Sequence, residues 1–304
     1  MNEPRLHADL FAGPTTAGNG ADHGSGLTVD SIGAILIAAG RLHASEAMKI
    51  VEQQQKRGLR FGEAAVQLGI LSADDINYAL SRQFSFPHLA SSDDSIATEV
   101  VSAFEPEHPL VEEMRKLRDR LIFHWTSAGS HRQAVAIVSP ERGDGRSYIG
   151  ANLAVVFAQL GWRTLLIDAD VRRPRQHDLF RFQNGIGLST VLAGRANSEA
   201  IRSVPSIATL GILPAGPTPP NPNDLFARSH FSSLLRRAHD DFDVLVLDAP
   251  PWSDGSGGRM VALEAGTAVI VARVNRSSAL GTRQVALDLA QAGRPALGVV
   301  LNRR

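Results

Sequence analysis

Residues 139–147 combine the residue types that bind a phosphate group at the start of a helix. They read Ser139-Pro140-Glu141-Arg142-Gly143-Asp144-Gly145-Arg146-Ser147. An apolar run precedes them and a helical pattern follows, and that order points backbone N–H groups and the helix dipole at a phosphate. Pro140 and Arg146 replace the first glycine and the lysine of the usual G-x-x-x-x-G-K-[ST] pattern. The loop alone therefore predicts either a phosphate site or an ordinary strand-to-helix turn.

Three aspartates follow two later apolar runs. Asp168 comes directly after residues 165–167, with Asp170 two positions later, and Asp248 comes directly after residues 245–247. Carboxylates at the ends of two strands beside a phosphate loop are where Mg²⁺ and its water ligands are held. The sequence therefore predicts a magnesium site next to the loop. The alternative is that Asp168 and Asp248 are only polar strand ends.

Short apolar runs alternate with amphipathic stretches in the second part of the chain. The runs cover residues 134–138, 164–167, 210–213, 244–247, 268–272 and 297–301. Short runs rich in β-branched residues and leucine, separated by helical patterns, are typical of buried parallel strands. The sequence therefore predicts an α/β fold, a doubly wound and mostly parallel sheet that carries the phosphate loop.

The composition is that of a globular protein long enough for two domains. Of the 304 residues, 43% are hydrophobic, and 31 basic side chains balance 31 acidic ones, so the bulk charge does not favour nucleic acid as a partner. The absence of cysteine excludes disulfides and iron–sulfur clusters. No apolar stretch approaches the roughly 18–20 residues of a membrane span, and the N-terminus lacks a signal-peptide pattern. We therefore expect a soluble, cytoplasmic protein.

An internal repeat precedes the sheet-forming region. Gly33 and Gly40 are followed at the same spacing by Gly62 and Gly69, with matching leucine and glutamine positions around them. Each copy reads as a helical hairpin, and two hairpins can bury one shared face. We therefore expect a disordered leader over 1–28, a small helical domain over 29–84, a linker over 85–108 and the phosphate-loop domain over 109–304.

Three motifs in order give the second domain a specific resemblance. Over residues 105–302 the chain resembles the bacterial tyrosine autokinases of exopolysaccharide synthesis, the chain-length determinant tyrosine kinases of the MinD/ParA-like class of ATPases. The motifs S-x-x-P-G-E-G-K-S, D-x-D-x-R and D-T-P of that family lie here at 139–147, 168–172 and 248–250. The resemblance implies ATP and Mg²⁺ as cofactors. It also implies a membrane chain-length determinant as partner and peripheral association with the inner membrane.

The resemblance also implies roles for individual residues. The nucleotide is expected to contact Arg142, Gly143, Asp144, Gly145, Arg146, Ser147, Tyr148 and Asn302. The metal is expected at Ser147, Asp168 and Asp248. Catalysis is assigned to Asp168, Asp170 and Arg146, with one of the two aspartates accepting a proton from an incoming tyrosine, although charge and positioning dominate such reactions.

A charged segment ahead of the sheet matches a further motif of the family. Glu112, Arg115 and Arg118 fit the pattern E-x-x-R-x-x-R, which joins neighbouring subunits in that family, so the resemblance implies a homo-oligomer. The alternative is a solvated helix with a local Glu–Arg pair worth a few tenths of a kcal/mol.

Departures from the family's pattern leave two functions open. Arg146 stands for the lysine, and the three lysines of the chain lie elsewhere. The chain has two tyrosines, Tyr78 and Tyr148, where the family has a tyrosine-rich tail, and Gly257 stands where the family has an aspartate, with Asp254 nearby. The chain is therefore predicted to be either a tyrosine kinase and ATPase or a non-catalytic, nucleotide-dependent regulator of the same machinery. A partition or septum-positioning ATPase is less compatible, because those proteins carry an additional lysine early in the loop.

The helical repeat has a resemblance of its own. Each copy is similar to the tandem motifs of the N-terminal domain of type II secretion and pilus ATPases, some of which bind cyclic di-GMP. The second copy begins Arg60-Phe61-Gly62 and keeps the arginine of that motif, whereas the first begins at Ser31. The domain is therefore predicted to be either a cyclic di-GMP sensor that uses Arg60 or a docking module.

Overall fold

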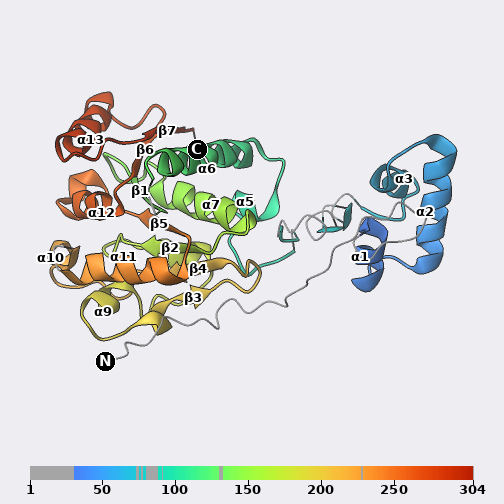
Figure 1. The fold of residues 1–304 in the computed structure, drawn as a ribbon, viewed down its shortest axis with the longest axis horizontal. Coiled ribbons are helices and arrows are strands. Elements are labelled where there is room, and N and C mark those ends of the chain that lie inside the picture. The colour runs from blue at the N-terminus through green and yellow to red at the C-terminus, as the bar shows by residue number, and fades with distance from the viewer. Residues whose placement is uncertain are drawn as a thin grey trace. The chain divides into compact units, whose positions relative to one another are not determined.

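The computed structural model divides the chain into two compact units, one ending at Asp93 and the other beginning at Asp94 (Figure 1). It describes residues 31–72, 75–76, 78–79, 88–90, 92–129, 133–226 and 229–303. The leader predicted over 1–28 lies outside the described residues. No helix within these ranges is long and apolar enough to cross a membrane.

The smaller unit shows the first half of each repeat as a short helix of the same length. Helix α1 (Ile32–Ala38) and helix α3 (Phe61–Gln67) both have seven residues, and α2 (Ala44–Arg57) follows α1. Leu36, Ile50 and Ala64 are fully buried in their shared core. The described helices of the two copies therefore share one buried core.

The second copy contains a helix cap, and one ion pair joins this cap to the first copy. Ser72 and Asp75 form the predicted cap, because the Ser72 N–H donates to Asp75 Oδ2 at 3.0 Å and the Asp75 N–H donates to Ser72 Oγ at 3.2 Å. Arg41 pairs with Asp75 at 2.9 Å and lies over the ring of Tyr78. The rest of the second hairpin, including Leu80 and Gln83, lies outside the described residues.

The larger unit begins earlier than the sequence predicts. Ile96, Val100 and Ala103 are buried, and α5 (Val101–Phe104) packs on the helix that follows the phosphate loop. The Ser102 N–H donates to Asn152 Oδ1 of that helix at 2.8 Å. Residues 94–108, predicted to be part of a linker, therefore belong to the unit that carries the sheet.

A seven-stranded sheet forms the centre of the larger unit. Its order is β3-β4-β2-β5-β1-β6-β7, and every neighbouring pair is parallel except β3 with β4. The strands are β1 (Gln133–Val138), β2 (Thr164–Asp168), β3 (Arg202–Ser203), β4 (Leu210–Leu213), β5 (Val244–Asp248), β6 (Ala268–Arg273) and β7 (Gly298–Asn302). All six predicted strands are confirmed, and the two-residue β3 is too short to leave an apolar run in the sequence.

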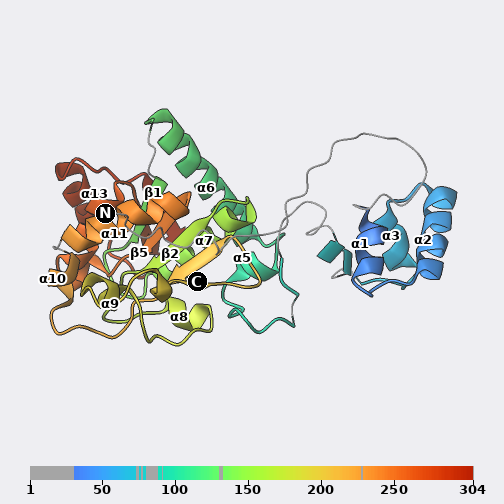
Figure 2. The ribbon, with the colours of Figure 1, turned by 60° about the horizontal axis from the view of Figure 1, so that its bottom comes forward.

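Helices cover both faces of the sheet (Figures 1 and 2). On one face, α6 (Pro109–Ser127) and α5 pack over α7 (Arg146–Gln159), which is buried on nearly every side and is mostly apolar for that reason. On the other face lie α9 (Leu188–Leu192), α10 (Pro222–Phe226), α11 (Ser229–Asp241), α12 (Gly257–Ala265) and α13 (Ala279–Gln291). Short helices connect them: α8 (Gln176–Leu179), η2 (Ser198–Ala200) and η3 (Trp252–Asp254). The doubly wound α/β fold is therefore confirmed.

The register of the central strands positions the functional side chains. Asp168 at the end of β2 is the direct register partner of Asp248 at the end of β5, and Asp248 is also paired in register with Ile137 of β1. Because β1 continues into residues 139–145, the carboxyl edge of the sheet brings the loop and both aspartates together.

Candidate nucleotide site

Two glycines give the loop between β1 and α7 its conformation. Gly143 and Gly145 have φ angles of 82° and 104°, which side chains rarely tolerate. A Cβ atom at Gly145 would collide with the amide nitrogen of Asn302, which donates to the carbonyl oxygen of Asp144 at 3.0 Å. The predicted nucleotide residue Asn302 therefore lies against the loop, at a point where only glycine fits.

The side chain of Asp144 holds the loop in shape. It is fully buried, and its Oδ2 accepts from the Glu141 N–H at 2.9 Å while its Oδ1 accepts from the Ser277 hydroxyl at 2.6 Å. Ser277 in turn accepts from the N–H of Arg273 at 2.6 Å, and Arg273 donates to the carbonyl oxygen of Gly143. Both carboxylate oxygens of Asp144 therefore accept hydrogen bonds that fix the loop.

Arg146, the first residue of α7, is turned into the protein. Its side chain is 6% exposed, and all three guanidinium nitrogens have partners. Nε donates to the carbonyl oxygen of Ala249 at 2.8 Å, Nη1 donates to Ser139 Oγ and to the Glu141 carbonyl oxygen, and Nη2 lies 3.5 Å from Asp170 Oδ2. The charge of Arg146 thus stays beside the loop, while its hydrogen bonds connect the loop to the end of β5.

Asp168 and Asp248 are neighbouring carboxylates inside the protein. Both are fully buried, and burial raises the pKa of each; the charge of Asp248 raises the pKa of Asp168 further. Asp168 accepts from the backbone N–H groups of Asp170, Arg175 and Gln176. Asp248 Oδ2 accepts from the Gln176 amide at 2.8 Å, and a hydrogen bond with the Ser147 side chain also acts to lower the pKa of this carboxylate. Its Oδ1 is buried and has no hydrogen-bond partner among the described residues.

Asp170 is the aspartate that lines the cavity beside the loop. Burial and the charge of Asp248 raise its pKa to about 6, although the Arg146 guanidinium acts in the opposite direction. A carboxyl group with that pKa exchanges protons near neutral pH, which suits a general base.

The cavity beside the loop has a volume of about 400 Å³. It is lined by Glu99, Arg142, Gly143, Gly145, Arg146, Ser147, Tyr148, Asp170, Arg173, Pro174, Arg175 and Leu179. Of these, seven are predicted site residues. Glu99, Arg175 and Leu179 carry no signal in the sequence, and Arg173-Pro174 appears there only as a stretch similar to the family.

Residues at the loop fit a hydrated Mg²⁺ ion with a nucleotide phosphate. Magnesium is bound through one or two carboxylates together with waters and phosphate oxygens, which requires few protein ligands. Asp248 offers a buried oxygen with no partner in the described structure, and Ser147 is the second residue of α7. Within the described ranges no three His, Asp or Glu side chains form a metal cage of their own.

The segment after β5 is attached to the start of the loop. The Trp252 N–H donates to the Ser139 carbonyl oxygen at 2.9 Å and the Ser253 N–H to that of Pro140 at 3.1 Å. Gly257, which replaces the family's aspartate, begins α12, and Asp254 ends η3. Asp254 is close enough for its charge to raise the pKa of Asp170.

The predicted contact segment on α6 faces partly inward. The Glu112 side chain is 58% exposed and lies 3.7 Å from Arg115, which also donates to the Pro106 carbonyl oxygen at 3.1 Å. Arg118 is 11% exposed and donates to the carbonyl oxygen of Val156 on α7. Arg118 therefore also attaches α6 to the helix of the loop.

Arg60 belongs to the smaller unit and precedes α3. Its N–H donates to Glu63 Oε2 at 3.0 Å, and the residue is exposed.

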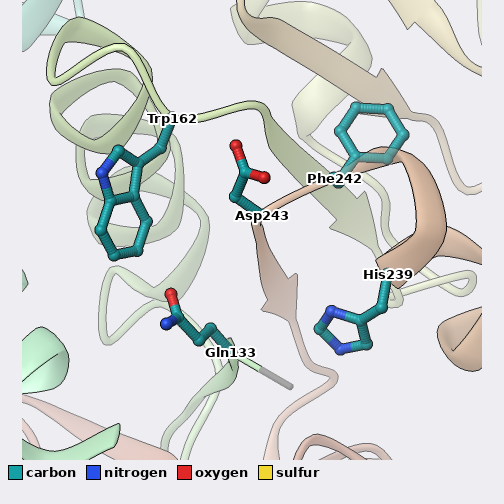
Figure 3. Close-up of a pocket in the computed structure, with 5 residues that line it drawn as sticks. All are labelled: Gln133, Trp162, His239, Phe242 and Asp243. Atoms are coloured by element: carbon teal, nitrogen blue, oxygen red, sulfur yellow. The ribbon is translucent and has the colours of Figure 1, made fainter. Parts of the chain in front are cut away.

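A second cavity lies at the opposite edge of the sheet (Figure 3). It has a volume of about 340 Å³ and is lined by Gln133, Trp162, His239, Phe242 and Asp243. Gln133 begins β1, while Trp162 and Asp243 precede β2 and β5, so this cavity is at the amino ends of the strands. It is therefore separate from the predicted site.

Comparison with known proteins identifies relatives of the sheet-bearing unit. No protein-family model matches the chain. The putative tyrosine-protein kinase CapB of Staphylococcus aureus is 32% identical over 200 residues, which are 66% of this chain and 86% of that relative.

Two solved structures agree with that relationship. The chimerical protein CapA2B2 has a TM-score of 0.64 and 30% identity over 75% of this chain and 98% of its own. The kinase domain of the Escherichia coli tyrosine kinase ETK has a TM-score of 0.62 and 30% identity over 67% of this chain and 79% of its own. The resemblance found in the motifs is thus confirmed, and the chain belongs to the family of bacterial tyrosine-protein kinases.

Proposed function

We propose that the larger unit binds ATP with Mg²⁺ at the loop of residues 139–147. The observation that carries this proposal is the buried pair Asp168 and Asp248, held in register at the ends of β2 and β5, with one oxygen of Asp248 lacking a partner within the described structure. Two adjacent buried carboxylates are unfavourable by themselves, and a cation compensates both.

The positive charge that would compensate the phosphates at this site comes from exposed arginines around the loop as well as from Arg146. Arg142 and Arg173 line the cavity and are exposed, and no hydrogen bond of either guanidinium is recorded in the part of the chain that the structure describes. Arg146 is already bonded through all three nitrogens. Backbone N–H groups of residues 142–146 and these two arginines are therefore the groups that would meet the phosphates.

The reaction that we propose is transfer of the γ-phosphoryl group of ATP to a tyrosine hydroxyl. The bond from the γ-phosphorus to the bridging oxygen of ADP breaks, a bond to the tyrosine oxygen forms, and the phenolic proton passes to Asp170. The raised pKa of Asp170 supports this role near neutral pH. Mg²⁺ held by Ser147, Asp168 and Asp248 would neutralise charge on the phosphates.

The biological setting that we propose follows from the family. The chain would act in exopolysaccharide or capsule synthesis, with the cytoplasmic segment of a membrane chain-length determinant as partner at the inner membrane. Glu112 and Arg115, which are partly exposed on α6, would contact a second copy in a homo-oligomer.

A non-catalytic regulator is the second candidate. Arg146 in place of lysine, with its side chain bonded inside the protein, and Gly257 in place of an aspartate favour it. Such a regulator would change its assembly state when nucleotide binds, and it would transfer no phosphoryl group.

The smaller unit enters this proposal as a docking module. Its described residues contain no feature at Arg60 that supports a cyclic di-GMP site, so the ligand is not part of the proposed function.

Incubation of the full chain with γ-labelled ATP separates the two candidates. The cytoplasmic segment of the membrane partner is added or omitted, and both label transfer and phosphate release are measured. Label on a tyrosine, lost in Asp170→Asn, supports the kinase. ATP binding without label and without phosphate release supports the regulator. Absence of ATP binding would overturn both.

A further inference from the structure

Gln176 contacts all three residues predicted to hold the metal. It is the first residue of α8 and is fully buried. Its side-chain Nε2 donates to Asp248 Oδ2 at 2.8 Å and to the carbonyl oxygen of Ser147 at 3.1 Å, and its backbone N–H donates to Asp168 Oδ2 at 2.9 Å. The side chain thus connects the loop helix with the end of β5, and the backbone of the same residue contacts the end of β2.

The orientation of the Gln176 amide is dictated by its neighbours. Both groups that its nitrogen contacts are acceptors, so the reversed amide would place an acceptor oxygen against a carboxylate and a carbonyl. The nitrogen must therefore face Asp248 and Ser147, and the oxygen must face elsewhere.

Two buried acceptors remain without partners at this point. Gln176 Oε1 and Asp248 Oδ1 are both inaccessible to water and have no hydrogen-bond partner among the described residues. They belong to side chains that are joined by a hydrogen bond. Buried acceptors are rarely left unpaired, and two of them on adjoining side chains indicate a shared donor or cation.

We infer that Gln176 is a positioning residue of the magnesium site. Its amide nitrogen fixes one oxygen of Asp248 and leaves the other free for the hydrated ion, and its Oε1 accepts a hydrogen bond from a water molecule of that ion. Groups that orient metal ligands in this way typically change metal affinity by about 10–100-fold when removed. This inference rests on the proposed binding of ATP with Mg²⁺.

Substitution of Gln176 by methionine tests the inference without a large change in volume. The full chain is titrated calorimetrically with a non-hydrolysable ATP analogue in Mg²⁺ and in EDTA, and the ratio of the two affinities measures the contribution of the metal. We expect that ratio to fall at least about tenfold in Gln176→Met, while affinity in EDTA stays unchanged.

Gln159→Met is the matched control. Gln159 is another buried glutamine, on α7, and its amide donates to the backbone carbonyl oxygen of Ser102 at 2.7 Å, away from the aspartates. A merely structural role predicts that both variants lose thermal stability and keep the wild-type affinity ratio. An unchanged ratio in folded Gln176→Met would overturn the inference.

A measurement on the wild type covers the case in which Gln176→Met does not fold. With Mn²⁺ and the same ATP analogue, the side-chain amide signals of Gln176 should broaden in an NMR spectrum, and those of Gln159 should not. Equal behaviour of the two amides contradicts the inference. If the wild type does not bind the ATP analogue at all, the proposed function fails first.

Discussion

The pKa values of acidic residues are shifted in opposite directions at the two edges of the central sheet. At the amino edge, Asp243 accepts the backbone N–H and the guanidinium of Arg163 at 2.7–3.3 Å, and these contacts outweigh burial and lower its pKa. At the carboxyl edge, burial raises the pKa values of Asp168, Asp170 and Asp248, and Arg146 is the cation bonded among them.

This difference supports the carboxyl edge as the candidate functional site. At the amino edge the charge of Asp243 is balanced by its partner Arg163. At the other edge three aspartates share one bonded cation, Arg146, so ionisation of all three is unfavourable. Clusters with pKa values displaced by burial and like charge are typical of functional sites. A bound cation would remove the difference, which makes the comparison testable.

Replacement of Asp248 by asparagine should give the largest effect. We expect about a 100-fold loss of ATP affinity in Mg²⁺, because the ion loses the charge of a buried ligand. Stability should not fall, since burial already disfavours the charged form. Equilibrium dialysis with labelled ATP, compared with Asp243→Asn, checks this. Equal losses in both variants would place the metal elsewhere.

Replacement of Asp170 by asparagine should stabilise the nucleotide-free protein at pH 7 by about 3 kcal/mol. The folded-state pKa of about 6 lies above the unfolded value, so the contribution of Asp170 is favourable at low pH and is lost as pH rises through about 6. Denaturant unfolding at pH 4.5 and pH 7.5 measures this. The gain should be clearly larger at the higher pH, and a gain that is the same at both values would refute it.

Arg146→Lys should lower the free energy of unfolding by about 1–2 kcal/mol. A lysine cannot reproduce the planar fork that reaches Ala249, Glu141 and Asp170 together, so buried acceptors lose their donors. Thermal unfolding with Arg163→Lys as the control at the other edge measures the difference. If the two variants lose the same stability, Arg146 does not hold the loop as described.

Asp243→Asn should have the smallest effect, a decrease of about 0.2–1 kcal/mol in the free energy of unfolding. The decrease should be smaller in high salt, because both side chains of the Arg163–Asp243 pair are about 40% exposed. Since the pKa of Asp243 is lowered, its contribution is present above the unfolded pKa and disappears as pH falls. The pH dependence is thus opposite in sign to that of Asp170. Urea unfolding at two salt concentrations tests both statements.

The carboxyl edge was predictable from the sequence because its main residues follow directly from strand ends. Each apolar run ends where its strand ends, so Asp168 and Asp248 are expected at the same edge of a parallel sheet, and the pairing of β2 with β5 brings them together. The glycines of the loop and the cap at Ser72 and Asp75 are equally local signals.

Other parts of the site depend on contacts between distant segments. Gln176 reaches Asp248 across 72 positions and Ser277 reaches Asp144 across 133, so no spacing reveals them. The direction of the Arg146 side chain depends on the Ala249 carbonyl oxygen, and the packing of residues 94–104 depends on Asn152 and Gln159 of α7. The sequence places the cation Arg146 at the loop, but its partners lie on segments that no local pattern connects to it.

The central claim is that the carboxyl edge of this sheet binds ATP through a magnesium ion. Calorimetric titration of the full wild-type chain with a non-hydrolysable ATP analogue, in Mg²⁺ and in EDTA, tests it most directly. We predict saturable binding at one site per chain, at least about tenfold tighter in Mg²⁺. No saturable heat at high micromolar nucleotide, or equal affinity with and without the metal, would contradict it.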